Sequence, residues 1–307
     1  MIQTVLGPIA PDALGVTLVH EHVLGRTPVP HNQKSLNGGG LDDEELAASE
    51  LQLFLDAGGQ SLVELTVEGL SPAPHALRRL AGRVGVSIVA GVGLYTASVH
   101  PAWVKDASAG RLEDHFVNGL WYGVGGTSVR GGVLGEFGIS SPIHADEVKA
   151  LRAAAHAQRR TGVGIMVNSD VPSAQLHRIL DFLQAEGVDL RRVALGHMDA
   201  LADHEYLGSL AVRGVWLCLD TFGHDARETT DRRKLAALER MLQAGWVGQL
   251  LVSQHVSNRR HYVKYGGKGY AHVLRGIVPA LMATGVGQET VQELLVQNPR
   301  RYLSGES

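Results

Sequence analysis

The sequence has a single cysteine, Cys218, among 307 residues. One thiol cannot form an intrachain disulfide, so we expect a reducing compartment, the cytoplasm. Lysine is also scarce: arginine outnumbers it by 22 to six, a bias typical of bacteria with GC-rich genomes. No apolar run approaches the roughly 20 residues that a membrane-spanning helix needs. The first residues lack the basic and apolar regions of a signal peptide.

Charge of one sign is lacking as well. The net charge is −3 and the sequence pI is near 6.6. A nearly balanced chain offers no electrostatic basis for binding nucleic acid or an anionic membrane. We therefore expect a small-molecule partner, with neither nucleic acid nor membrane involved.

Apolar residues, in contrast, make up 44% of the chain and fall into short runs of strand length. The predicted strands are 17–22, 61–66, 87–94, 132–138, 163–168, 193–197, 214–220 and 249–255. Most are continuously apolar, which is typical of strands buried on both faces. The predicted helical segments are 42–56, 73–84, 145–161, 174–187, 203–212, 232–245, 270–285 and 288–296, and the longest predicted loop is 25–40.

Eight strands that alternate with helices predict an α/β fold of the (β/α)8 TIM-barrel type, as a single domain over residues 1–307. An open, doubly wound sheet is the alternative. No Gly-x-Gly-x-x-Gly motif follows the first strand to support that alternative through dinucleotide binding. The loop at 25–40 follows the first strand and should lie at the C-terminal mouth of the barrel.

Two histidines end the first predicted strand, in the order His20-Glu21-His22. Side chains alternate along a strand, so residues two apart share a face. His20 and His22 should therefore be able to hold one metal ion together. A His-x-His pair is a weak signal alone, because two unligated histidines at a strand end are common.

Other predicted strands also end in polar residues, and barrel enzymes perform chemistry at these C-terminal ends. The residues are Glu136 (fourth strand), Asn168 (fifth), His197 with Asp199 (sixth), Asp220 (seventh), and Gln254 with His255 (eighth). Each one alone could anchor a loop. Histidines from three strands converging with a carboxylate match the ligands of Zn²⁺ or a similar divalent ion.

Several stretches resemble the phosphotriesterase-related branch of the amidohydrolase superfamily. They are residues 7–9 (Gly-Pro-Ile), 17–22 (Thr-Leu-Val-His-Glu-His), 93–95 (Gly-Leu-Tyr), 100–104 (His-Pro-Ala-Trp-Val), 135–138 (Gly-Glu-Phe-Gly), 196–199 (Gly-His-Met-Asp), 265–272 (Tyr-Gly-Gly-Lys-Gly-Tyr-Ala-His) and 298–301 (Asn-Pro-Arg-Arg). The resemblance implies a (β/α)8 fold and one or two metal ions at the barrel mouth. It also implies hydrolysis of esters, lactones or phosphoesters by a metal-activated water, and a homodimer.

In this family the first-strand histidines bind one metal, and a fourth-strand Glu or carboxylated Lys bridges two metals. None of the six lysines lies in the fourth predicted strand, so Glu136 would take the bridging position. The resemblance therefore carries His20, His22, Glu136 and His197 over as ligand candidates.

The sequence departs from the family at two positions. Asn168 stands where the family has a histidine, and Gln254-His255 stands where the family has an aspartate, often after a histidine. An amide oxygen is a poor substitute for an imidazole on a borderline-soft ion. We expect one divalent ion, zinc, instead of two. Its expected ligands are His20, His22 and His255, with Glu136 as a further ligand and His197 as a ligand or substrate contact.

The residue pattern leaves three functions open. The first is a metal-dependent hydrolase acting on an ester, lactone, amide or phosphoester, with His255, Asp220 and Glu136 as the catalytic candidates. The substrate-contact candidates are Tyr95, Trp103, Asn168 and Gln254, although the two aromatic residues could equally serve packing. The second is a non-hydrolytic lyase, isomerase or cyclisation enzyme acting on a specialised metabolite, because the altered positions change the general base. The third is a metal-free binding protein.

Overall fold

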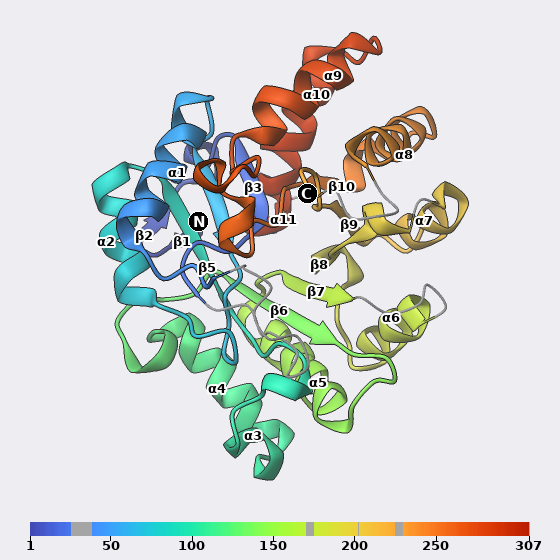
Figure 1. Cartoon of the computed structure of the whole chain (residues 1–307). Coiled ribbons are helices and arrows are strands. Elements are labelled where there is room, and N and C mark those ends of the chain that lie inside the picture. The colour runs from blue at the N-terminus through green and yellow to red at the C-terminus, as the bar shows by residue number, and fades with distance from the viewer. Residues whose placement is uncertain (26–38, 170–174, 202, 225–229, 307) are drawn as a thin grey trace.

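A computed structural model describes residues 1–25, 39–169, 175–201, 203–224 and 230–306 of the chain. Eight parallel strands form one sheet that curves into a barrel, with helices around the outside (Figure 1). In chain order these strands are β3 (Thr17–Glu21), β4 (Ser61–Glu64), β5 (Ser87–Val92), β6 (Val133–Ile139), β7 (Ile165–Ser169), β8 (Val193–Leu195), β9 (Trp216–Leu219) and β10 (Leu250–Val252). The predicted (β/α)8 class is confirmed.

Two hydrophobic layers explain why the strands are apolar at consecutive positions. In β3, Leu18 packs in the layer shared with the helices, whereas its neighbour Val19 packs inside the barrel. Leu62 and Val63 of β4 divide between the layers in the same way. Because adjacent side chains point to opposite faces and both faces are buried, polar alternation disappears.

The barrel closes where β10 meets β3. The His255 N–H donates to the His20 carbonyl at 3.1 Å, and the His22 N–H donates to the Val256 carbonyl at 2.9 Å. A hairpin of β1 (Ile2–Thr4) and β2 (Gly7–Ile9) adds its Ile2 side chain to the inner layer of the barrel. The seam at the β10–β3 junction therefore lies between histidines predicted to hold metal.

The helices pack against the outside of the sheet (Figure 1). They are α1 (Glu44–Asp56), α2 (Pro74–Val84), α3 (Trp103–Asp106), α4 (Ala109–Trp121), α5 (Ala145–Thr161), α6 (Leu176–Ala185), α7 (His204–Ala211), α8 (Asp231–Gln243), α9 (Val278–Ala283), α10 (Gln288–Gln292) and α11 (Asn298–Ser304). Within the described ranges, none of them is long and apolar enough to cross a membrane.

Helix α4 is absent from the sequence-based prediction, which left the region between β5 and β6 without a helix. Its buried residues include Leu112, Phe116 and Leu120, spaced four apart as a helix requires. Gly110 and Gly119 interrupt this pattern, and glycine disfavours a helix interior. Gly119 packs against Val92, where an added Cβ would lie 2.8 Å from a Val92 methyl group.

Most of the predicted loop at 25–40 lies outside the described residues.

Candidate active site

Irregular pairing in β3 and β6 shapes the first part of the site. Leu18 pairs with Leu62 and Glu21 pairs with Glu64, so β3 has one more residue than β4 over this stretch. A similar shift in β6 lies between Leu134 and Phe137. Bulges of this kind redirect side chains and are common beside active sites. The irregular stretches contain His20 in one strand and Glu136 in the other.

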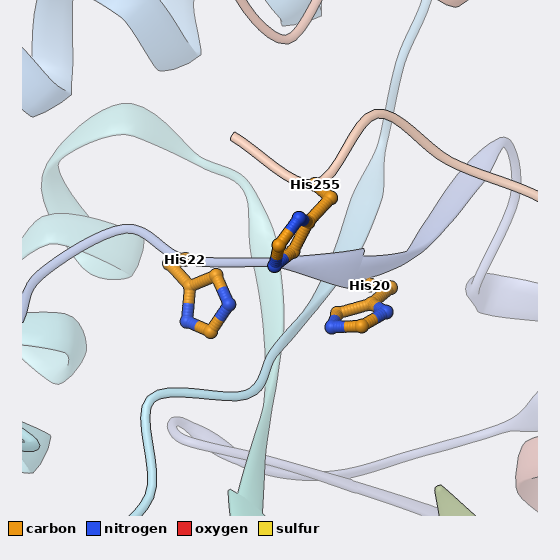
Figure 2. Close-up of side chains that lie close together, drawn as sticks. All are labelled: His20, His22 and His255. Carbon is orange, nitrogen blue, oxygen red and sulfur yellow. The ribbon is translucent and has the colours of Figure 1, made fainter. Parts of the chain in front are cut away.

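Four imidazole rings gather at the C-terminal ends of three strands. The centroid of the His20 ring lies 5.9 Å from that of His22, 5.3 Å from that of His197 and 4.6 Å from that of His255. Figure 2 shows His255 reaching His20 on β3, and His22 just after β3, from the opposite side of the seam. The nitrogens of His20, His22 and His255 lie within 4.8 Å of one another. The structure thus brings these predicted ligands together.

Asp220, just after β9, supports two of these rings. Its Oδ2 lies 2.6 Å from His20 Nδ1, and its Oδ1 lies 2.9 Å from His197 Nδ1 and accepts the His197 N–H at 2.9 Å. In the neutral form of each ring, which is the form that binds a metal, an Nδ1–H donated to a carboxylate leaves the lone pair on Nε2. Both Asp220 oxygens are therefore occupied in orienting histidines.

His22 has a comparable support. Its Nδ1 lies 3.1 Å from the Thr66 hydroxyl. Donation of the Nδ1–H to that oxygen leaves the His22 Nε2 directed at Glu136, 3.4 Å away. Thr66 is fixed in turn, because its backbone N–H donates to Glu64 at 3.3 Å.

Glu136 lies between the two β3 histidines. Its Oε2 is 3.3 Å from His20 Nε2, and its Oε1 is 3.4 Å from His22 Nε2. Asn168 on β7 donates its amide N–H to Oε2 at 2.5 Å. His20 Nε2 is buried and lacks a well-aligned hydrogen bond in the part of the chain that the structure describes. This nitrogen, the neighbouring imidazole nitrogens and the Glu136 carboxylate together are a ligand set that fits a divalent metal ion.

The charges in the cluster are strongly coupled. Burial lowers the pKa of His20, but Asp220 and Glu136 outweigh it and raise the pKa to about 10. Burial would raise the pKa of Asp220, yet His197 and His20 hold it far below its usual value. Burial lowers the pKa of His22 to about 4, and burial with the neighbouring imidazoles lowers the pKa of His255 well below 6.5. In the metal-free protein, the cationic His20 and the carboxylates of Asp220 and Glu136 therefore lie beside the neutral imidazoles of His22 and His255.

The other predicted contact residues lie in different surroundings. The Gln254 side chain donates to the Gly269 carbonyl and accepts the Val273 N–H, so it links β10 to the following segment. Trp103 packs its ring against His115, with centroids 4.9 Å apart, and beneath the Arg111 guanidinium. The structure does not bring Gln254 or Trp103 into the histidine cluster.

Tyr95 remains near the site through its backbone. An added Cβ on Gly138 would lie 2.9 Å from the Tyr95 carbonyl carbon, so the segment after β5 crosses close to the end of β6. The Tyr95 carbonyl accepts a hydrogen bond from His100 Nε2 at 2.7 Å. Its predicted contact with substrate stays a prediction.

Sequence reasoning missed several supporting residues. Glu21 and Ser253 lie behind the histidines, and His224 stacks on His255 with centroids 5.7 Å apart. Glu21 carried a usable signal, since an acidic residue inside an apolar strand must find hydrogen-bond donors when buried. His224 had none, because it follows β9 in a segment without regular pattern.

Comparisons with known proteins agree with this architecture. A model of the phosphotriesterase family matches residues 1–303. The N-acetyltaurine hydrolase of Danio rerio is 30% identical over 344 residues, covering 99% of this chain and 97% of that protein. A resiniferatoxin-binding protein from Rhodobacter sphaeroides superposes with a TM-score of 0.92 at 34% identity, covering 98% of this chain and 94% of the other. The phosphotriesterase homology protein of Escherichia coli, complexed with phosphate in its active site, superposes with a TM-score of 0.89 at 27% identity, covering 95% and 99%.

Proposed function

Because the chain belongs to the phosphotriesterase family, we propose that it hydrolyses a small carboxamide, ester or lactone that carries an anionic group. The family relationship makes the chain a metal-dependent hydrolase. The observation that carries the proposal is the convergence of His20, His22 and His255 within 4.8 Å beside Glu136. When bound there, a divalent ion lowers the pKa of a water molecule from about 15.7 toward neutrality.

One zinc ion fits the residues better than two. His20, His22 and His255 supply imidazole nitrogens, with Glu136 within reach of the β3 pair. At the position where the family has another histidine, the Asn168 amide N–H points at Glu136 instead. With its N–H directed at Glu136, the amide does not present its oxygen there, and an amide oxygen is a poorer zinc ligand than an imidazole, so the second position is weakened. His197 then does not ligate the metal and lies beside the position of the substrate.

The protein's own groups are arranged to move a proton. A neutral imidazole that binds metal through one nitrogen has no lone pair left, so His255 cannot be both ligand and base. Asp220 is already bonded to two imidazoles. We propose that Asp220 acts through His197, holding that ring in the orientation in which its Nε2 receives the proton, and that Glu136 orients the reacting groups.

Charge favours an anionic substrate. A histidine at position 255 adds no negative charge where the family has an aspartate, so a metal-loaded site is about one unit more positive. Two similar proteins fit this idea: one has N-acetyltaurine, a sulfonate-bearing amide, in its name, and one holds phosphate in its active site. N-acylated amino acids and aminosulfonates are therefore the first substrates to try.

The experiment is a hydrolysis panel run on zinc-loaded and metal-free protein in water enriched in ¹⁸O. The panel contains N-acyl amino acids, N-acyl aminosulfonates, lactones, aryl esters and phosphotriesters. We expect zinc-dependent turnover of an anionic amide, ester or lactone with ¹⁸O in the acid product. Turnover without ¹⁸O incorporation would favour the lyase or isomerase alternative. Equal turnover by metal-free protein would contradict the metal role.

Further features of the protein are part of the same proposal. We infer that residues 1–307 act as one domain in a bacterial cytoplasm. A homodimer is expected from the family. Size-exclusion chromatography with light scattering distinguishes the dimer from a monomer.

A further inference from the structure

We propose that Glu21 is a positioning residue that fixes the backbone of residues 253–256 and thereby places the His255 imidazole in the histidine cluster. The inference rests on the proposed function, since it assigns Glu21 a role toward the same metal site. Glu21 is the middle residue of His20-Glu21-His22, and its side chain is fully buried. Its carboxylate faces the seam between β3 and β10.

Four donors converge on this carboxylate from one short segment. Oε1 accepts the Ser253 hydroxyl at 2.7 Å, the Gln254 N–H at 2.8 Å and the His255 N–H at 3.2 Å. Oε2 accepts the Val256 N–H at 2.7 Å. The segment follows directly on β10, which ends at Val252, and its first amide still pairs with β9, because the Ser253 N–H donates to the Leu219 carbonyl at 3.1 Å. For the Gln254 and Val256 amides, the carboxylate takes the place of a strand partner.

The backbone conformation of His255 shows what the hydrogen bonds to Glu21 achieve. His255 has a φ of +52°, in the left-handed region that non-glycine residues seldom adopt. Such a conformation persists only where surrounding bonds determine it. The bonds to Glu21 hold the residues on both sides, and the His255 N–H is shared with the His20 carbonyl at 3.1 Å. The ring is consequently carried across the seam toward His20 and His22.

Ser253 connects the same carboxylate to the β3 histidines. The Ser253 hydroxyl accepts the His20 N–H at 3.1 Å and lies 3.1 Å from the His20 carbonyl oxygen. Glu21 therefore joins the backbone of the two segments that supply His20, His22 and His255. The Glu21 carboxylate, which is not among the predicted ligands, thus links the segment of His255 to the backbone of His20.

Glu21→Gln is the sharpest variant. It keeps the shape of the side chain, but its NH₂ group cannot accept a backbone N–H. Glu147 offers a matched control, because it is also buried and accepts three backbone N–H groups and a serine hydroxyl, from Ala97, Ser140 and His144. Glu147→Gln therefore removes a similar set of bonds away from the seam.

The experiment measures zinc affinity of the metal-free proteins by chelator competition, with the visible absorption of the cobalt-loaded proteins as a second readout. We expect Glu21→Gln to weaken zinc binding by about 10- to 100-fold, as for other residues that orient ligands, and to change the cobalt spectrum. Glu147→Gln should lower the melting temperature but keep the wild-type zinc affinity and spectrum. Wild-type affinity and spectrum in Glu21→Gln, or equal losses in both variants, would overturn the inference. Wild-type protein that binds no zinc would overturn the proposed function itself.

Hydrogen exchange keeps the inference testable if Glu21→Gln does not fold. In metal-free wild-type protein, the amides of Gln254 and Val256 should exchange as slowly as amides within β10, because the carboxylate holds them. Exchange at the rate of an exposed loop would overturn the inference.

Discussion

His20 Nδ1 lies 2.6 Å from Oδ2 of Asp220, with both side chains fully buried. The contact fixes the imidazole so that Nε2 faces Glu136 and the other histidines. Removing a charge partner from a buried pair costs more than the bond itself, because the remaining charge is left unpaired. This relationship makes Asp220 a support of the site as well as part of its charge balance.

Replacement of Asp220 by asparagine should weaken metal binding by about 10- to 100-fold, the usual range for residues that orient metal ligands. The amide has one acceptor oxygen in place of two, so it cannot serve both His20 and His197. Chelator competition with metal-free protein measures the effect. Unchanged affinity in a variant that folds normally would show that neither histidine needs this carboxylate.

Asn168→His should increase zinc binding from about one equivalent per chain toward two. The substitution removes an N–H donor from Glu136 and supplies an imidazole, which zinc prefers to an amide. Elemental analysis after extended dialysis measures the stoichiometry. Two equivalents already present in wild-type protein would contradict the account of Asn168.

Position 255 should separate metal binding from hydrolysis. His255→Ala removes one of three clustered ligands, so we expect lower metal content and a loss of turnover on the best panel substrate. His255→Asp keeps a ligand and adds a negative charge and a proton acceptor, so hydrolysis of simple lactones or esters should rise. Steady-state kinetics with metal analysis checks both. Full occupancy and activity in His255→Ala would reduce His255 to a structural role.

The stability of metal-free protein should fall as the pH rises from about 6.5 to about 10. The pKa of His20 is raised from 6.5 to about 10 in the folded state. Its contribution is therefore fully present below the unfolded value and is lost as the pH rises through the folded value. Thermal melts across this range should show a steeper decline in wild-type protein than in His20→Gln, which cannot titrate. Parallel declines would contradict the His20–Asp220 pairing.

The barrel was predictable because the strands are buried on both faces and are therefore mostly apolar at consecutive positions, as in β5. Helix α4 was not, because two glycines interrupt a pattern that Leu112, Phe116 and Leu120 otherwise present. Gly119 is there to let the helix approach Val92. That requirement depends on a tertiary contact and cannot be read from local periodicity.

The histidines at the strand ends were predictable from their positions, but the bonds that orient them were not. The sequence places Asp220 at the mouth of the barrel. It does not show that Asp220 contacts both His20 and His197, because these residues lie 200 and 23 positions away from it in the chain. The role of Glu21 depends on the left-handed turn at His255, which the sequence does not signal. Gln254 was predicted to contact substrate because it lies next to His255 in the sequence. Its side chain instead bonds to the backbone of Gly269 and Val273, which the sequence does not indicate.

We expect one zinc ion, held by imidazoles from both sides of the β3–β10 seam. Anomalous diffraction at the zinc edge, from crystals of protein loaded with zinc and dialysed, locates the ion and its ligands. There should be one strong peak within about 2.1 Å of ring nitrogens of His20, His22 and His255. A peak without His255 among its ligands, or two peaks of equal height bridged by Glu136, would contradict this expectation.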